Sequence, residues 1–346
     1  MLRLIGLTLI LSALALVGFS YYVSQPVVEG TRGSFEPMIA NRAVALTFAR
    51  TEQDLILVSR HAGDAVIGVN LTELYGIEAT SDLIRFVSNL DQKTLPDAGP
   101  FEERYPLDDL LMPLSYTHPS VAAGTNFREH AEEIYSDDPP FLFPKLAVAG
   151  SWNQSVPFLP RLDFEAEVCL FPLADIVSAD LLPRFGVVLC NDFTDRWTLV
   201  KEIELGQPLG FTGFASGKGC EKCLPTGYLV VVPKSPDFYL SLDVSLYVND
   251  ELRQNFAMKD MILPISEFVS QAFENKASVY WKGDEPVSLL PHGSVPEGTL
   301  MLTGTGAGVL FKPANIWNQR FYLQAGDVVR TEARYLGHLE NRVEGF

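Results

Sequence analysis

The sequence has little positive charge. Its 346 residues include 26 Lys and Arg against 43 Asp and Glu, which gives a formal net charge of −17 at pH 7. A protein that binds nucleic acid gains affinity by neutralising phosphates with Lys and Arg, so this balance disfavours that class. It also disfavours an anionic membrane surface as the main partner. The 47% hydrophobic and 20% charged contents are close to those of globular domains, so the chain can bury a core.

Charge of either sign is missing from positions 4–28, whose centre reads LIGLTLILSALALVGF. As a helix, about 20 apolar residues rising 1.5 Å each cover the ~30 Å hydrocarbon core of a bilayer. Tyr21 and Tyr22 follow where interfacial aromatic residues usually lie. We therefore expect residues 1–25 to form a hydrophobic helix that serves as a transmembrane anchor.

The residues around this segment predict its orientation. Arg3 precedes it and Glu29 follows it, so the positive-inside tendency places the rest of a membrane-anchored chain outside the cytoplasm. The alternative is a signal segment, because Gly18-Phe19-Ser20 offers a loose cleavage site of small residues. Cleavage there would leave an exported soluble protein.

Cysteine is also scarce, with four residues in the whole chain, too few for a disulfide scaffold. Cys220 and Cys223 form a C-x-x-C pair in a Gly- and Lys-rich loop, whereas Cys169 and Cys190 stand singly in apolar strands. A zinc site would need a second pair or a histidine partner. We therefore expect buried or loop thiols, with oxidation of Cys220 and Cys223 open if the chain is exported.

Beyond the N-terminal segment the pattern changes once. Residues 26–110 combine a Pro- and Gly-containing linker with short alternating segments and a helical spacing over Leu71 to Leu90, which predicts a small α+β unit. Residues 111–346 are dominated by strand-like runs, with helices expected at Asn126 to Ile134 and Pro264 to Phe273. A β-rich α+β fold with a closed or sandwiched architecture is therefore expected.

Acidic residues gather at the ends of two of these runs. Glu165 and Glu167 alternate with apolar residues in the segment Leu162 to Phe171, so they share one face of a strand with Asp163. Asp192 directly follows the buried-looking run Phe185 to Cys190. Three converging carboxylates suit a hard divalent cation such as Mg²⁺.

Further polar residues fit catalysis. His130 and Glu133 lie three residues apart in an expected helix, so the carboxylate can fix the imidazole tautomer for proton transfer. Lys218 lies in a loop between two glycines. The segment Thr303 to Gly308 ends an apolar strand in small residues, which permit close backbone approach to a ligand.

In this order, the fragments resemble the motifs of the fumarylacetoacetate hydrolase superfamily from about Ser115 to the C-terminus. The matching segments are Asn126 to Glu133, Glu165-Ala166-Glu167, Asn191 to Arg196, Lys218, Val248 to Gln254, and Thr303 to Gly308. Departures from the family pattern occur at Trp197, Leu199, Glu221 and Gly306, which lie on the substrate side or behind the site. They predict a pocket unlike that of the best-studied branches.

The resemblance implies a rolled mixed β-sandwich that forms a homodimer, with Mg²⁺, or Mn²⁺ or Ca²⁺, on Glu165, Glu167 and Asp192. It further implies that His130, aligned by Glu133, activates water. Lys218 would act with them as a catalytic residue, and Arg196 and Thr305 would bind the substrate.

The activity implied is hydrolysis of a carbon–carbon bond in a small acylpyruvate-like or 1,3-diketo acid. Two alternatives stay open. One is a lyase, hydratase, decarboxylase or isomerase that acts on a 2-oxo acid with the same metal site. The other is a membrane-tethered sensor that binds a 2-oxo acid without turning it over.

Overall fold

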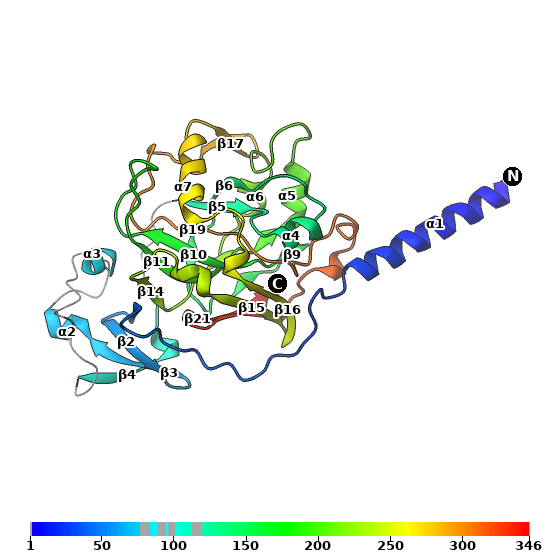
Figure 1. The fold of residues 1–346 in the computed structure, drawn as a ribbon. Helices are drawn as coiled ribbons and strands as arrows, with labels where there is room; N and C mark the ends of the chain where they lie inside the picture. Colours follow the sequence, from blue (N-terminus) through cyan, green and yellow to red (C-terminus); the bar gives the residue numbers. More distant parts are fainter. Residues whose placement is uncertain (1, 77–82, 89–94, 96–100, 113–118, 346) are drawn as a thin grey trace.

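The computed structural model describes residues 2–76, 83–88, 95, 101–112 and 119–345 (Figure 1). A ten-stranded sheet forms the centre of the fold. Its strands, in spatial order, are β4 (Glu102–Pro106), β3 (Ala65–Asn70), β2 (Leu55–His61), β1 (Ala45–Arg50), β14 (Val230–Pro233), β11 (Phe185–Asn191), β10 (Ala166–Pro172), β19 (Met301–Leu302), β5 (Ser120–Gly124) and β6 (Phe141–Lys145). Of its neighbouring pairs, β19 and β5 run parallel and the others antiparallel.

A second sheet packs against the middle of the first. Its order is β16 (Glu251–Ala257), β15 (Asp243–Val248), β20 (Val328–Ala333), β21 (Gly337–Glu344) and β8 (Val156–Pro157). Strand β10 contacts β15, and β11 contacts β20 and β21. Every residue of β10 and β11 is buried as a result. The expected β-rich α+β fold with mixed sheets is confirmed.

Short pairs and helices surround the two sheets. The pairs are β9 (Leu162–Asp163) with β12 (Thr194–Asp195), β7 (Ala149–Gly150) with β13 (Leu224–Pro225), and β17 (Val279–Lys282) with β18 (Glu285–Ser288). The helices are α1 (Leu2–Val23), α2 (Leu71–Tyr75), α3 (Leu83–Ser88), α4 (Arg128–Glu133), α5 (Arg196–Glu202), α6 (Phe214–Gly217) and α7 (Ile265–Glu274). Single 3₁₀ turns span Leu107–Asp109, Phe238–Ser241, Met258–Asp260 and Gln319–Phe321.

Local sequence signals explain several boundaries. Asn249 and Asp250 adopt φ angles of 50° and 67° and close the expected hairpin between β15 and β16. The single helix expected over Leu71 to Leu90 is wrong within the described residues, because Gly76 takes a left-handed conformation and ends α2 after Tyr75. Residues 77–82 and 89–90 lie outside the described residues.

The expected N-terminal unit is continuous with the rest of the ten-stranded sheet. Strand β1 pairs with β14 in an antiparallel ladder from Ala45 opposite Pro233 to Phe48 opposite Val230. Strands β1 to β4 therefore extend the sheet that also contains β10 and β11. The division of the chain at residues 110 and 111 stays a prediction.

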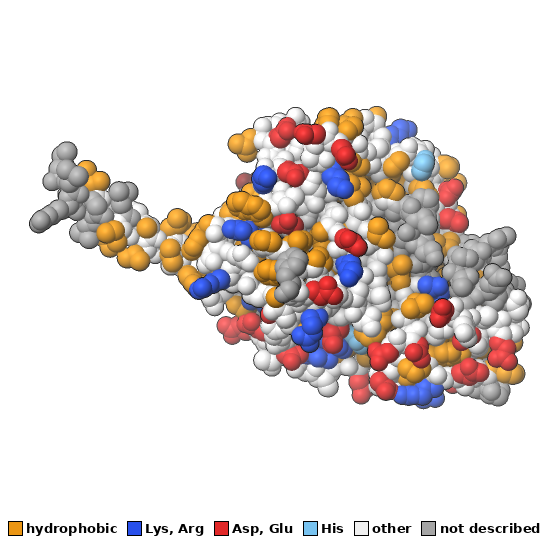
Figure 2. All heavy atoms as spheres, turned by 180° about the vertical axis from the view of Figure 1, so that it is seen from behind, with side chains coloured by type: hydrophobic (Ala, Val, Ile, Leu, Met, Phe, Trp, Pro, Cys, Tyr) orange, Lys and Arg blue, Asp and Glu red, His pale blue; other side chains and the backbone are white. Residues whose placement is uncertain are grey.

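The transmembrane anchor predicted for residues 1–25 is wrong. Its residues Leu2–Val23 form helix α1, which projects from the body with apolar side chains along it (Figures 1 and 2). However, the part of the chain that the structure describes contains no helix with both the length and the apolar character needed to cross a bilayer. The predicted membrane-anchored location fails with the anchor, and so does the membrane as a partner.

The last turn of α1 is fastened to the protein body. Ser20 is buried, donates to the Ala314 carbonyl at 2.6 Å and accepts from Trp317 Nε1 at 3.0 Å. The Tyr21 ring packs edge-on against Phe321, with the centroids 4.9 Å apart. These contacts make the end of the apolar run part of the packed protein.

All four cysteines are paired, so the expectation of thiols is wrong for Cys169 and Cys190, whereas oxidation of Cys220 and Cys223 was one of the two expected states. Cys169 and Cys190 join β10 to β11, and Cys220 and Cys223 close their own loop. In the β10–β11 register, Cys190 lies opposite Glu167 and Cys169 lies opposite Val188, so the two cysteines are diagonal neighbours. That proximity depends on the strand register, which the spacing in the sequence does not reveal.

A buried histidine predicts how stability depends on pH. His338 on β21 packs against Trp152, and its Nδ1 lies 3.3 Å from the Tyr228 hydroxyl. Burial, assisted by the positive charges of Arg330, His61 and Arg32, lowers the pKa of His338 to about 3. Between pH 6.5 and pH 3 the unfolded chain therefore binds one more proton at this position than the folded chain does.

We expect this histidine to lower the free energy of unfolding by up to about 1.4 kcal/mol for each pH unit of acidification in that window. His338→Gln should flatten the pH dependence of the unfolding free energy between pH 7 and pH 4, measured with urea. The exposed His292 provides the control, since His292→Gln should keep the original slope. Equal slopes in all three proteins would contradict the assignment.

Candidate metal and catalytic site

Two neighbouring strands bring three carboxylates together. Because β10 and β11 are antiparallel, the start of β10 lies beside the end of β11, with Ala166 opposite Asn191. Glu167 lies on β10, Glu165 directly precedes it, and Asp192 directly follows β11. All three side chains are buried, and one ligand oxygen of each lies within 4.8 Å of those of the others.

Glu165 was expected to share a strand with Glu167, but the strand is interrupted between β9 and β10, and Glu165 lies in this interruption. The backbone N–H of Glu165 donates to the Asn191 side chain at 3.0 Å, and that of Ala166 donates to Gln254 Oε1 at 3.0 Å. Side chains thus replace the strand ladder for both backbone groups.

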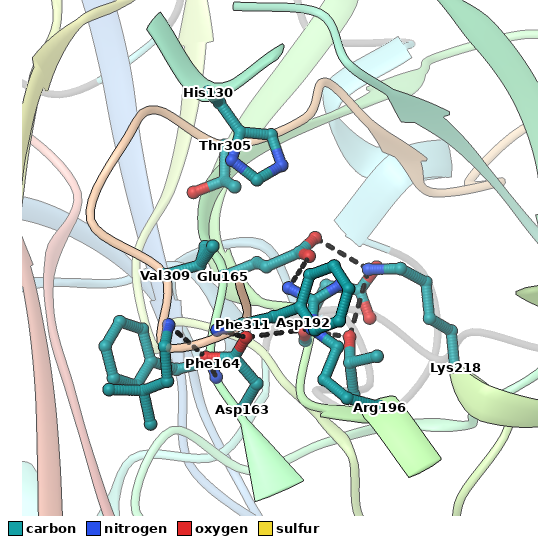
Figure 3. Close-up of polar contacts among 12 residues, drawn as sticks. His130, Asp163, Phe164, Glu165, Asp192, Arg196, Lys218, Thr305, Val309 and Phe311 are labelled. Carbon is teal, nitrogen blue, oxygen red and sulfur yellow. Dashed lines mark hydrogen bonds and ion pairs between the residues drawn. The ribbon is translucent and has the colours of Figure 1, made fainter. Parts of the chain in front are cut away.

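Three buried cations hold two of the carboxylates, and Figure 3 shows two of these cations, Lys218 and Arg196. Lys218 Nζ lies 2.6 Å from Glu165 Oε2 and 3.0 Å from Asp192 Oδ2. Lys145 Nζ lies 2.5 Å from Asp192 Oδ1. Arg196 bridges Asp163 at 2.8 Å and Glu165 at 2.5 Å. The three cations thus join Asp163, Glu165 and Asp192 in one continuous buried network.

The surroundings shift the pKa values of Glu165 and Glu167 in opposite directions. Burial is the largest influence on Glu165 and favours its neutral form, but the charges of Lys218, Arg196 and His130 outweigh it and lower the pKa of Glu165 to about 2. For Glu167, burial and the charges of Asp192 and Glu165 act together and raise the pKa well above its usual value. Glu167 accepts a hydrogen bond from the Gly304 N–H at 2.7 Å but joins none of the ion pairs among the described residues.

This donor set fits a divalent cation. Three buried carboxylates supply oxygen ligands, which hard cations prefer. The unpaired charge of Glu167 is the one that a bound cation would compensate. The buried triad can therefore hold a divalent metal.

The predicted His130–Glu133 pair is formed on α4. His130 Nδ1 lies 3.3 Å from Glu133 Oε2. Glu133 is fixed in turn by Lys312 Nζ at 2.6 Å and by the Gly308 N–H at 3.0 and 3.1 Å from its two oxygens. Burial alone would raise the pKa of Glu133, but the hydrogen bond from His130 and the charge of Lys312 lower it below its usual value. Glu133 is therefore held as a carboxylate.

The structure brings most of the predicted site residues to one cavity of about 490 Å³. Its lining includes His130, Glu165, Arg196, Lys218 and Thr305. Figure 3 shows His130 beside Thr305 on the side opposite Arg196, with Glu165 between them. Glu165 of the carboxylate triad, the histidine and the lysine thus adjoin the same space.

The two residues predicted to bind substrate already have partners in the protein. Arg196 is held by Asp163 and Glu165. Thr305 Oγ1 donates to the Ala166 carbonyl at 2.7 Å and accepts from Gln254 Nε2 at 2.8 Å. Their role toward a substrate stays a prediction.

Three further residues were not predicted from the sequence. Lys145 ends the apolar run Phe141 to Lys145, and the only signal in the sequence was a single lysine at the end of that run. Asp163 was noted only as a neighbour on the strand, but it accepts from the backbone N–H groups of Leu310 and Phe311 as well as from Arg196. Lys312, which holds Glu133, gave no signal in the sequence.

Residues 120–344 match the family model described as "Fumarylacetoacetate (FAA) hydrolase C-terminal". This match covers more than half of the chain, and the chain belongs to the fumarylacetoacetate hydrolase family. An uncharacterized protein from Staphylococcus saprophyticus is 26% identical over 249 residues, which span 67% of this chain and 71% of the relative.

Solved structures share the fold. One is maleylpyruvate hydrolase from Sphingobium sp. SYK-6 in complex with manganese(II) and pyruvate, with a TM-score of 0.56, 20% identity, and coverage of 86% of this chain and 98% of that one. Another is 2-hydroxyhepta-2,4-diene-1,7-dioate isomerase from Mycobacterium marinum, with a TM-score of 0.53, 17% identity, and coverage of 86% and 98%. At these identities the likeness extends to the fold alone.

The position of Glu167 gives a test of the metal site. We expect Glu167→Gln to lower Mg²⁺ and Mn²⁺ affinity at least tenfold by calorimetry, because one anionic ligand is lost. The same variant should leave the melting temperature of the metal-free protein unchanged or raised, because a buried carboxylate without a cationic partner is removed. Glu285→Gln, at an exposed position, is the matched control. Unchanged metal affinity in Glu167→Gln would exclude the site.

Proposed function

We propose that this chain is a metal-dependent hydrolase that cleaves a carbon–carbon bond in an acylpyruvate-like or 1,3-diketo acid. The observation that carries the proposal is that His130, Lys218 and Glu165 of the buried carboxylate triad line one cavity, with Glu133 held against His130. A bound Mg²⁺ or Mn²⁺ would supply a Lewis acid that binds the 2-oxo-carboxylate end of the substrate.

His130 is proposed as the general base. Glu133 accepts from Nδ1 and so fixes the tautomer in which Nε2 carries a lone pair. Nε2 can then take a proton from a water molecule in the cavity as the water attacks the substrate's 4-oxo carbon. Because Lys312 and Gly308 hold Glu133 from the other side, the imidazole keeps this orientation.

The remaining steps balance as a hydrolysis. Water adds to the 4-oxo carbon, the bond between carbons 3 and 4 breaks, and its electron pair forms the enolate of pyruvate. The proton held on His130 returns to carbon 3, which gives pyruvate and a carboxylic acid. Lys218 and Arg196, both with raised pKa values because of their carboxylate neighbours despite burial, remain protonated and stabilise the charge that develops on the enolate oxygen.

A second candidate is an isomerase, lyase, hydratase or decarboxylase that acts on a 2-oxo acid at the same site. It is favoured by the fold shared with an isomerase, and by the fact that a base such as His130 can serve proton transfer as well as hydrolysis. The membrane-tethered sensor loses its support with the predicted anchor. A homodimer remains the expected assembly.

Product analysis separates these candidates. We expect the full-length chain with Mg²⁺ or Mn²⁺ to convert acetylpyruvate into pyruvate and acetate in equal amounts, and EDTA to abolish the reaction. Carbon dioxide release would identify a decarboxylase, and rearrangement without cleavage an isomerase. Either outcome would overturn the hydrolase proposal.

The general base gives a second test. His130→Gln should lower kcat by about 10²–10⁴-fold, while Mn²⁺ affinity remains within twofold, because the imidazole is not a metal ligand in this proposal. His292→Gln, at an exposed position, is the control and should retain full activity. Nearly full activity of His130→Gln would remove His130 from the mechanism.

A further inference from the structure

The cavity beside the carboxylates extends beyond the space that a 2-oxo acid needs. Its volume of about 490 Å³ lies in the range of sites that hold much larger ligands. One end contains His130, Glu165 and Lys218. The rest is lined largely by aliphatic and aromatic side chains, chief among them Phe141, Phe143, Leu199, Ile203, Leu209 and Phe214.

Helix α5 leads from the polar end of the cavity along this apolar wall. Arg196 begins the helix and contacts Glu165, and Leu199 and Val200 follow it three and four residues later. Ile203 directly follows the end of the helix, and all four residues line the cavity. Residues at this spacing share one face of a helix. At 1.5 Å per residue, the wall from Arg196 to Ile203 is roughly 10 Å long.

Strand β6 also connects the polar end of the cavity to its apolar wall. Phe141, Phe143 and Lys145 alternate along the strand and so point to one side of the sheet. Lys145 reaches Asp192, and the Phe143 ring lies 5.5 Å from Lys218 Nζ. Phe141 extends the row away from the carboxylates.

The aromatic part of the wall is a packed cluster. The Phe214 ring lies 5.0 Å from those of both Phe141 and Phe143, measured between centroids. A Cβ at Gly124 or Gly210 would come within 2.3 or 2.7 Å of the Phe141 ring, so these two glycines leave the space in which the ring lies. The aromatic cluster is therefore part of the packed structure of the protein.

The charges around the cavity are distributed unevenly. Its two cationic side chains, Arg196 and Lys218, are both bound to Glu165 at the polar end. The exposed lining residues Asp137 and Asp138 are both acidic. A carboxylate at the apolar end of the cavity would thus find no free cation among the lining residues, which is unfavourable.

We propose that the site selects monocarboxylic acylpyruvates with an apolar acyl chain, which lies against the α5 face and the Phe141–Phe143–Phe214 cluster, and rejects dicarboxylic ones. This inference rests on the proposed function. It adds the class of substrate: one carboxylate at the metal end and a hydrocarbon tail.

The test compares acyl chains of increasing length. With the metal-loaded full-length protein, kcat/KM should rise roughly three- to fourfold per methylene from acetylpyruvate to hexanoylpyruvate, as expected for burial of each CH₂ group. Succinylpyruvate, which ends in a second carboxylate, should be at least tenfold poorer than pentanoylpyruvate. No dependence on chain length, or a preference for succinylpyruvate, would overturn the inference.

A charge placed on the wall tests its location. Ile203→Lys should lower the ratio of kcat/KM for pentanoylpyruvate to that for succinylpyruvate at least tenfold, because it adds a cation at the apolar end. Ile262→Lys, at an exposed position outside the cavity, is the matched control and should leave the ratio unchanged. An unchanged ratio in folded Ile203→Lys protein would overturn the placement of the tail.

Binding without turnover separates this inference from the proposed function. Calorimetry on the Mn²⁺-loaded protein should show tighter binding of 2-oxooctanoate than of pyruvate. It should also show weaker binding of 2-oxoadipate than of 2-oxooctanoate. If no acylpyruvate is cleaved but this order holds, the hydrolase proposal fails and the tail site stands. If acetylpyruvate is cleaved but the order is reversed, the tail site fails and the hydrolase proposal stands.

Discussion

The site depends on the antiparallel pairing of β10 with β11. That pairing places the start of one buried strand beside the end of the other, and so gathers four carboxylates, Asp163, Glu165, Glu167 and Asp192, in the protein interior. Such a cluster is costly unless it is compensated. Lys145, Arg196 and Lys218, delivered by β6, α5 and the loop after α6, compensate three of the four charges.

The remaining negative charge explains why the site suits a cation and an anion together. With one carboxylate in excess, a divalent ion would reverse the local balance to one positive charge. A substrate with one carboxylate would restore neutrality in a buried space, where unbalanced charge is most unfavourable. The charge balance and the apolar wall therefore both favour a ligand with one carboxylate and a hydrocarbon tail.

Much of the site could be predicted from the sequence because its residues occur in ordered motifs. Glu165, Glu167, Asp192, His130, Glu133 and Lys218 were all identified, and the structure brings them together. Lys145 was missed because a single lysine at the end of an apolar strand has no motif around it. The pairing of Cys169 with Cys190 was missed because it depends on the register of β10 and β11. The interruption of the strand before β10 was missed because it depends on the side chains of Asn191 and Gln254, which are distant in sequence. The N-terminal helix was predicted correctly as a helix but wrongly as an anchor, because no helix among the described residues has the length and apolar character to cross a bilayer.

The ladder between β1 and β14 has a practical consequence for how the chain can be divided. Residues 120–344 match the family, but β14 also pairs with β1, and β11 lies on its other side. A fragment trimmed to the matched residues would therefore leave Val230, Val231 and Val232 on an open sheet edge, with unpaired backbone groups facing solvent. Bare apolar edges of this kind recruit strands from other chains and promote aggregation. The smallest unit that closes this edge begins before Ala45.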